Sequence, residues 1–215
     1  MVETIPENLQ RAVEHLYKGG IVLLLDNPER ENEGDLVLAA EYATPGRVHD
    51  LLRDSSRKIC VSMTEQRLKS LELPPVVRQP TNPSACKFHT PVDARDEKYT
   101  GLGAEDRAAA IFTLLHDTVS VYHPDSNLDV PGHTDTLRAD SGGVLARQGH
   151  TEGSLELMAL AGLKPMAAIV EVWDGSAMLS GPMKGKAKLE AFARNRGFPK
   201  VYINELAEYR RMQGY

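Results

Sequence analysis

Two short apolar runs, residues 21–25 and 36–40, flank a strongly acidic segment near the start of this chain. Each run has the length and the continuous apolar character of a buried strand. The segment between them carries acidic side chains at Asp26, Glu29, Glu31, Glu33 and Asp35. The runs therefore predict a group of carboxylates at a strand end, where sites on α/β folds tend to lie.

Side chains at alternate positions of an extended chain share a face, so we expect Glu31, Glu33 and Asp35 to point the same way, with Arg30 on the other side. Neighbouring carboxylates repel one another and need a divalent cation, a basic neighbour or open water to stay ionised. The pattern by itself fits either a solvated acidic turn or a cation site. The buried-type strands on both sides of the segment favour the cation site.

Helical and extended patterns alternate along the rest of the chain. This alternation predicts one α/β (α+β) domain over residues 1–215, with a mixed β-sheet covered by helices. The prolines of residues 73–83 predict a surface loop, and residues 123–129 are interpreted as a polar linker. Helices are expected over residues 7–18, after Thr44, after Gly103, over 151–161 and around Leu189; strands are expected over 58–63, 87–92, 136–139, 167–173 and 201–203.

Composition and charge exclude several classes of protein. With 41% hydrophobic and 26% charged residues, the chain is typical of a globular protein. A formal net charge of −5 argues against nucleic acid as a partner. No apolar stretch approaches the ~20 residues that span a bilayer, and the N-terminus lacks a secretory signal. Cys60 and Cys86 do not form a disulfide scaffold, so we expect a protein of the reducing cytoplasm. The lack of a long apolar stretch leads us to expect no membrane partner.

Residues 147–151 (RQGHT) stand where a helix is expected to begin. Free N–H groups at a helix start attract anions, Gly149 allows close approach, and Arg147 and Thr151 add a guanidinium and a hydroxyl. Gln148 belongs to the same candidate phosphate cradle, and the imidazole of His150 suits a divalent metal. An ordinary helix start with Thr151 as the cap and Arg147 on the surface explains the pattern equally well.

Two further residues are candidates for proton transfer. His133 follows Pro131-Gly132, which we interpret as a tight turn that presents the ring into a cleft. Glu171 interrupts the apolar run 167–172, so its carboxylate either is paired, has a raised pKa, or faces solvent. Cys60, within the expected strand 58–63, is most simply a packing residue.

Several of these stretches together resemble the 3,4-dihydroxy-2-butanone 4-phosphate synthase family of riboflavin biosynthesis. The first signature is residues 26–35 (DNPERENEGD), and the longest is residues 142–152 (GGVLARQGHTE). Shorter matches lie at 58–61 (KICV), 100–107 (TGLGAEDR), 131–133 (PGH) and 160–165 (LAGLKP). Departures stand at Val130, where the family usually has arginine, and at Gly103, where it usually has serine.

The resemblance implies a lyase that converts ribulose 5-phosphate to 3,4-dihydroxy-2-butanone 4-phosphate and formate. It also implies Mg²⁺ or Mn²⁺, two ions at each site, and a homodimer whose sites combine residues of both chains. Two alternatives remain: a diverged sugar-phosphate lyase, isomerase or dehydratase that releases no formate, and a non-catalytic paralogue that binds a phosphorylated ligand.

The resemblance also assigns roles to residues. Glu31 and His150 are the implied metal ligands, and His133 and Glu171 are the implied proton-transfer pair. The other implied site residues contact the substrate or its surrounding shell. They are Asp26, Glu33 and Asp35 around the sugar, Arg30, Arg147, Gln148, Gly149, Thr151 and Thr100 around the phosphate, and Cys60 in the pocket wall, with Asp35 and Cys60 close to the reaction.

Overall fold

The computed structural model describes residues 5–82, 85–173 and 181–214. The strands found in these residues are β1 (Val22–Leu25), β2 (Gly34–Ala39), β3 (Cys60–Met63), β4 (Lys87–Ala94), β5 (Leu128–Arg138), β6 (Met166–Glu171) and β7 (Lys200–Tyr202). The helices are α1 (Glu7–Tyr17), α2 (Pro45–Arg53), α3 (Glu65–Ser70), α4 (Ala104–His116), α5 (Gly143–Ala146), α6 (His150–Leu160), α7 (Lys186–Arg196) and α8 (Ile203–Met212), with a 3-10 turn at Ala40–Tyr42.

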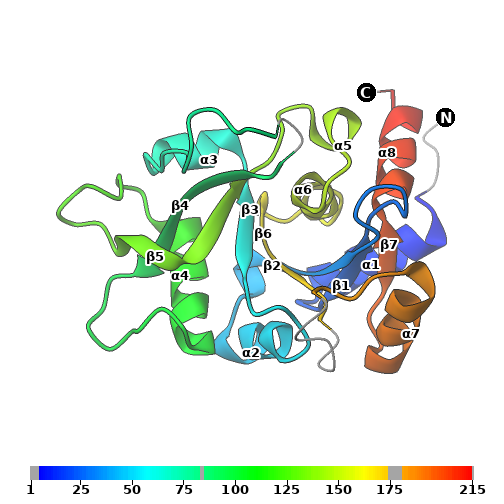
Figure 1. Ribbon diagram of the computed structural model, residues 1–215, viewed down its shortest axis with the longest axis horizontal. Helices are drawn as coiled ribbons and strands as arrows, with labels where there is room; N and C mark the ends of the chain where they lie inside the picture. Colours follow the sequence, from blue (N-terminus) through cyan, green and yellow to red (C-terminus); the bar gives the residue numbers. More distant parts are fainter. Residues whose placement is uncertain (1–4, 83–84, 174–180, 215) are drawn as a thin grey trace.

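All of these strands join one sheet in the order β4-β5-β3-β6-β2-β1-β7 (Figure 1). β3 and β5 are parallel, as are β1 and β7, whereas the other neighbouring strands are antiparallel. The expected class, a mixed sheet covered by helices, is confirmed. None of the described helices has both the length and the apolar character needed to cross a membrane.

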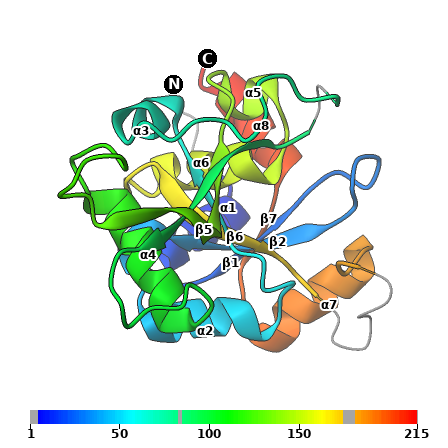
Figure 2. The same ribbon diagram turned by 60° about the vertical axis from the view of Figure 1, so that its left-hand side comes forward.

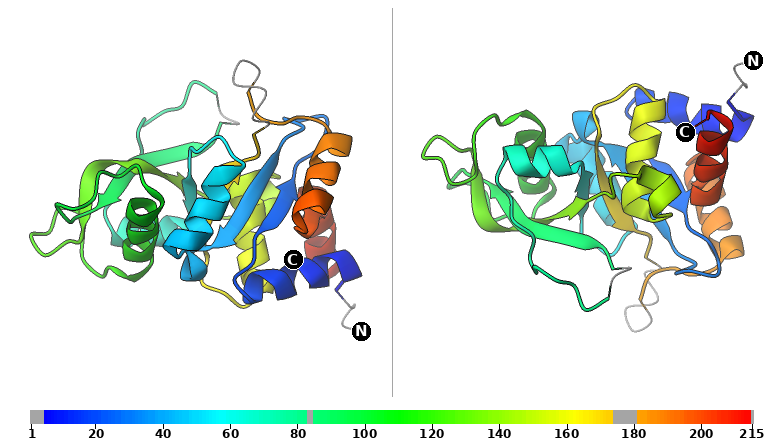
Figure 3. Two further views of the ribbon diagram at one scale, coloured as in Figure 1. Left: turned by 90° about the horizontal axis from the view of Figure 1, so that it is seen from below. Right: turned by 90° about the horizontal axis from the view of Figure 1, so that it is seen from above.

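Helices cover both faces of the sheet (Figure 2). Leu23 and Leu25 of β1 face the core formed with α2, α4 and α7, whereas Val22 and Leu24 face the core formed with α1, α6 and α8. This alternation of neighbouring side chains explains the continuous apolar run, because both faces of the strand are buried. The terminal helices α1 and α8 lie at one end of the sheet beside β7 (Figure 3).

Start and stop signals in the sequence explain where several helices begin and end. The Thr44 side chain accepts a hydrogen bond from the Arg47 N–H at the start of α2, and Thr64 caps α3 in the same way. Gly197 ends α7 with a left-handed φ of 68°, a conformation that glycine adopts without steric cost.

The interpretation of residues 123–133 was wrong in two respects. Residues 128–138 form β5, so the expected polar linker is shorter, and Pro131-Gly132 lies within that strand rather than in a tight turn. Proline interrupts a ladder of hydrogen bonds and is tolerated at irregularities. The register between β4 and β5 shifts on both sides of Val92, and these shifts accommodate the proline.

Candidate active site

The loop between β1 and β2 is organised around the buried carboxylate of Asp26. Its Oδ2 accepts hydrogen bonds from the Glu31 N–H at 3.1 Å and from Arg30 Nη1 at 2.9 Å, while Oδ1 accepts one from the Glu33 N–H at 2.9 Å. Arg30 also contacts Glu31 at 2.6 Å. Residues 28–31 form a turn instead of an extended segment, so the expectation that Arg30 lies on the other side from the acids was wrong.

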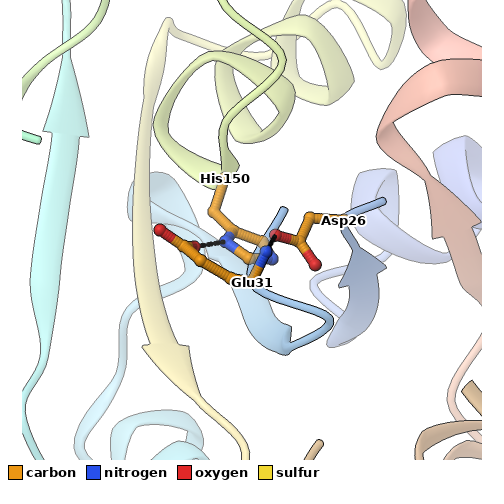
Figure 4. Close-up of side chains that lie close together, drawn as sticks. All are labelled: Asp26, Glu31 and His150. Atoms are coloured by element: carbon orange, nitrogen blue, oxygen red, sulfur yellow. Dashed lines mark hydrogen bonds and ion pairs between the residues drawn. The ribbon is translucent and has the colours of Figure 1, made fainter. Parts of the chain in front are cut away.

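His150, the first residue of α6, faces this loop (Figure 4). One potential ligand atom from each of Asp26, Glu31 and His150 lies within 4.8 Å of the other two. His150 Nδ1 is 3.9 Å from Glu31 Oε2 and 3.8 Å from Asp35 Oδ1, distances too long for hydrogen bonds. Residues far apart in the sequence are therefore brought together as expected.

This arrangement fits a divalent cation. His150 Nε2 and Asp35 Oδ1 are buried, and neither has a hydrogen-bond partner among the described residues. Burial lowers the pKa of His150, which favours the neutral imidazole that binds metals. Burial, with Glu171, Glu31, Glu33 and Asp26 adding repulsion, raises the pKa of Asp35 well above its usual range. A cation would relieve that repulsion.

A pocket of about 240 Å³ opens beside the cluster. Strand pairing builds its base, because Asp35 lies opposite Glu171 on the neighbouring strand and Cys60 lies opposite Ile169. Burial raises the pKa of the Cys60 thiol, which therefore stays protonated. The lining residues include Arg30, Glu31, Glu33, Asp35, His150, Thr151 and Glu171 at the acidic end, and Lys58, Cys60, Cys86, Phe88 and Leu137 on the other walls.

The start of α6 differs from the ordinary helix start that was the alternative for residues 147–151. Gly149, not Thr151, is the N-cap, and Thr151 is buried in the first turn, where it lines the pocket. A Cβ on Gly149 would lie 2.1 Å from Arg147 Nη1, so a side chain there would displace the Arg147 guanidinium. Arg147 contacts Glu152 at 2.6 Å and Cys86 Sγ at 3.5 Å. Neither Arg147 nor the half-buried Gln148 lines the pocket.

His133 and Thr100 are not among the residues that line this pocket. His133 Nδ1 lies 2.6 Å from Asp93 Oδ2, and its backbone N–H donates to Asp93 Oδ1 at 3.0 Å. The hydroxyl of Thr100 donates to Asp106 at 2.9 Å. Gly101 packs directly on the pair, since a Cβ there would lie 2.3 Å from the His133 ring. These residues form a second polar cluster, in which Asp93 fixes the orientation of the His133 imidazole.

Sequence reasoning missed Asp93 and Lys58. Asp93 stands near the end of the predicted strand 87–92, and a carboxylate at a strand end was the available signal. Lys58 opens the KICV match, but nothing in that motif indicates that its side chain reaches the pocket.

Comparisons with known proteins agree with this geometry. The family model described as 3,4-dihydroxy-2-butanone 4-phosphate synthase matches residues 10–209. The synthase of Shewanella sediminis is 36% identical over 208 residues, covering 97% of this chain and 92% of the relative. That of Syntrophotalea carbinolica is 38% identical over 201 residues, covering 94% and 89%.

A solved structure of a 3,4-dihydroxy-2-butanone 4-phosphate synthase in complex with two magnesium ions is also similar. Its TM-score is 0.80 at 35% identity, and the match covers 92% of this chain and 94% of that one. Fold, site and relatives together define an enzyme of the lyase type. The chain belongs to the 3,4-dihydroxy-2-butanone 4-phosphate synthase family, which makes that four-carbon phosphate in riboflavin biosynthesis.

Proposed function

We propose that this protein converts ribulose 5-phosphate to 3,4-dihydroxy-2-butanone 4-phosphate and formate, with Mg²⁺ or Mn²⁺ as cofactor and two ions at each site. The observation that carries the proposal is the convergence of Glu31 and His150 beside the buried Asp35 and the half-buried Glu171 that lies opposite it. The two magnesium ions of the similar synthase structure support the proposed cofactor. Carbon, hydrogen and oxygen balance without net uptake of water, since the water lost after enediol formation is regained when formate leaves.

The residues of the pocket have distinct roles in this proposal. Glu31 and His150 hold the cation, which would supply Lewis-acid stabilisation of the negative charge that develops on the sugar oxygens. Asp35 and Glu33 contact the sugar hydroxyls or water around it. Glu171 moves protons from its position opposite Asp35, and the protonated Cys60 thiol lines the pocket wall from the neighbouring strand β3.

His133 supplies the second proton-transfer group, with its ring oriented by Asp93. A histidine whose Nδ1 is fixed by a carboxylate has its other nitrogen available to a substrate. His133 does not line the pocket of its own chain. We therefore propose a homodimer in which His133 of one subunit completes the site formed by Glu31 and His150 of the other.

One assay tests the reaction. The protein is incubated with ribulose 5-phosphate and Mg²⁺, and the products are followed by NMR. Formate and the butanone phosphate are expected in equal amounts. Loss of substrate without formate would instead indicate a diverged isomerase or dehydratase, and saturable binding without turnover would indicate a non-catalytic paralogue.

A further inference from the structure

Lys58 is a cation in the pocket wall that no step described so far uses. Among the described residues that line the pocket, Arg30 and Lys58 carry permanent positive charges. The Arg30 guanidinium is engaged with Asp26 and Glu31 inside the acidic loop. Lys58 comes from a different part of the fold, immediately before β3, so the two cations belong to separate walls.

A backbone irregularity places Lys58 there. Between the Ser55–Val172 bridge and the Cys60–Ile169 pair, the chain before β3 has four residues, whereas β6 has only two. The extra residues bulge out of the ladder, and Arg57 adopts a φ of 62°, which side chains rarely adopt. Serine side chains hold the bulge, since Ser55 Oγ accepts from the Arg57 N–H at 3.2 Å. Bulges of this kind re-aim side chains next to active sites.

Two contacts then hold the ammonium group. Lys58 Nζ lies 3.3 Å from Asp135 Oδ2 and 4.7 Å from the centre of the Phe88 ring. Asp135 is opposite Cys60 in the pairing of β3 with β5, and Phe88 lines the pocket. An ammonium has more N–H donors than a single carboxylate contact uses, so Lys58 can bind a ligand while it stays attached to Asp135.

Among the described lining residues, Lys58 is therefore the cation with N–H donors to spare for an anion, whereas Arg30 is occupied by the acids of its own loop. The substrate of the proposed reaction carries such an anion, because ribulose 5-phosphate ends in a phosphate group. Arg147, the arginine expected to contact phosphate, contacts Glu152 and does not line the pocket.

We propose that Lys58 is a specificity-determining residue whose ammonium group, held by Asp135 and Phe88, binds the phosphate of the sugar substrate. The identity of the substrate rests on the proposed function, but the anion contact itself does not. Lys58 therefore selects phosphorylated over unphosphorylated sugars and contributes to binding more than to the chemical steps.

Binding of inorganic phosphate tests the contact without turnover. Isothermal titration calorimetry in the presence of Mg²⁺ compares wild type with Lys58→Met and with the control Lys69→Met. Lys69 is another exposed lysine in an ion pair, with Glu65 at 2.8 Å, and it does not line the pocket. Loss of a charge-assisted hydrogen bond at a partly exposed site should weaken phosphate binding about tenfold in Lys58→Met. The control should bind like wild type.

Kinetics test the specificity. In Lys58→Met, the KM for ribulose 5-phosphate should rise about tenfold while kcat stays within about twofold, because the lost interaction is made equally before and during reaction. Turnover of unphosphorylated ribulose, measured at high concentration, should not fall. Lys58→Met leaves Asp135 unpaired, and its charge would repel phosphate. The double variant Lys58→Met/Asp135→Asn removes that charge and should still bind phosphate about tenfold more weakly than wild type.

The two proposals fail separately. If wild type releases no formate from ribulose 5-phosphate, the proposed reaction is wrong, while phosphate binding still decides the role of Lys58. The inference is overturned if wild type binds no inorganic phosphate, if both lysine variants bind it equally well, or if the double variant regains wild-type affinity.

Discussion

Asp26 and Glu31 lie on the same loop and within reach of the same candidate cation position, but their surroundings differ. The Asp26 side chain is fully buried and accepts hydrogen bonds from two backbone N–H groups and from Arg30. The Glu31 side chain is 45% exposed, and it forms an ion pair with Arg30 and lies 3.9 Å from His150 Nδ1. Asp26 therefore builds the loop, whereas Glu31 remains available to a ligand.

The substitution Glu31→Gln should abolish metal-dependent turnover, by about 100-fold or more, because it removes a charged ligand of the metal. The fold should remain intact. Loss of one negative charge also reduces the repulsion that raises the pKa of Asp35. Calorimetric titration with Mg²⁺, steady-state kinetics and thermal unfolding measure these effects. Glu29→Gln, the same change at an exposed position of the loop, should behave like wild type; normal turnover in Glu31→Gln would remove Glu31 from the site.

Asp26→Ala should affect both stability and metal binding. The substitution leaves two partly buried N–H groups of the loop and Arg30 without their acceptor, which should lower the free energy of unfolding by about 2 kcal/mol. For a chain of this size that corresponds to a fall in Tm of roughly 4–8 °C. Mg²⁺ affinity should fall too, since Glu31 loses its fixed position. An unchanged Tm would show that the loop does not depend on Asp26.

Residue types in the acidic segment made the cluster of carboxylates predictable, because Asp26, Glu31, Glu33 and Asp35 all fall between two apolar runs. The side on which Arg30 lies was not predictable in the same way. It depends on a turn that forms only when the Asp26 carboxylate collects the N–H groups of Glu31 and Glu33. Local periodicity carries no information about such a bond.

At the scale of elements, the proline-rich loop is fastened to β4. The Val76 N–H donates to the Phe88 carbonyl at 3.0 Å, and the Thr90 N–H donates to the Pro74 carbonyl at 2.9 Å. Between these bonds, the buried ring of His89 lies with Nδ1 2.8 Å from the Leu73 carbonyl oxygen. Burial lowers the pKa of His89, although the bond to Leu73 acts in the opposite direction.

This lowered pKa predicts a pH dependence of stability. Below the ordinary histidine pKa of about 6.5, the unfolded chain binds a proton more readily than the folded protein does. The free energy of unfolding should therefore fall as pH decreases from about 7 towards the lowered pKa of His89. Thermal unfolding without added metal at pH 7.5 and 5.5 measures the loss.

The matched control is His89→Asn, whose side-chain amide can replace the Nδ1 donor but does not titrate. This variant should lose less stability than wild type over the same pH interval. The remaining loss includes His15 and His150, whose pKa values are also lowered by burial. Equal losses in wild type and His89→Asn would contradict the assignment.

Elements with strong local signals could be predicted, and those set by pairing could not. α2 has a threonine cap followed by proline, and its start was predicted to the residue. β5 contains proline and glycine and lacks regular alternation, so only its pairing with β3 and β4 defines it as a strand. The sheet order, which brings Asp35 beside Glu171, likewise depends on contacts between distant segments.

At the scale of the whole molecule, the described residues of one chain present two polar clusters that do not share a pocket. Glu31 and His150 belong to the first, and His133 with Asp93 belongs to the second. A reaction that needs both clusters therefore needs a second copy of the chain. The first cluster of one subunit would then face the second cluster of the other. Two-fold symmetry would then create two equivalent sites, each with residues from both chains.

Mixing two inactive variants tests this arrangement. Glu31→Gln and His133→Asn should each be inactive alone. After they are unfolded together in equal amounts and refolded, half of the dimers should contain one chain of each kind. Each mixed dimer should have one site with both substitutions and one intact site, so activity should return to about a quarter of the wild-type value. If every site used the Glu31 and His133 of a single chain, no pairing could restore an intact site, and the mixture would stay inactive.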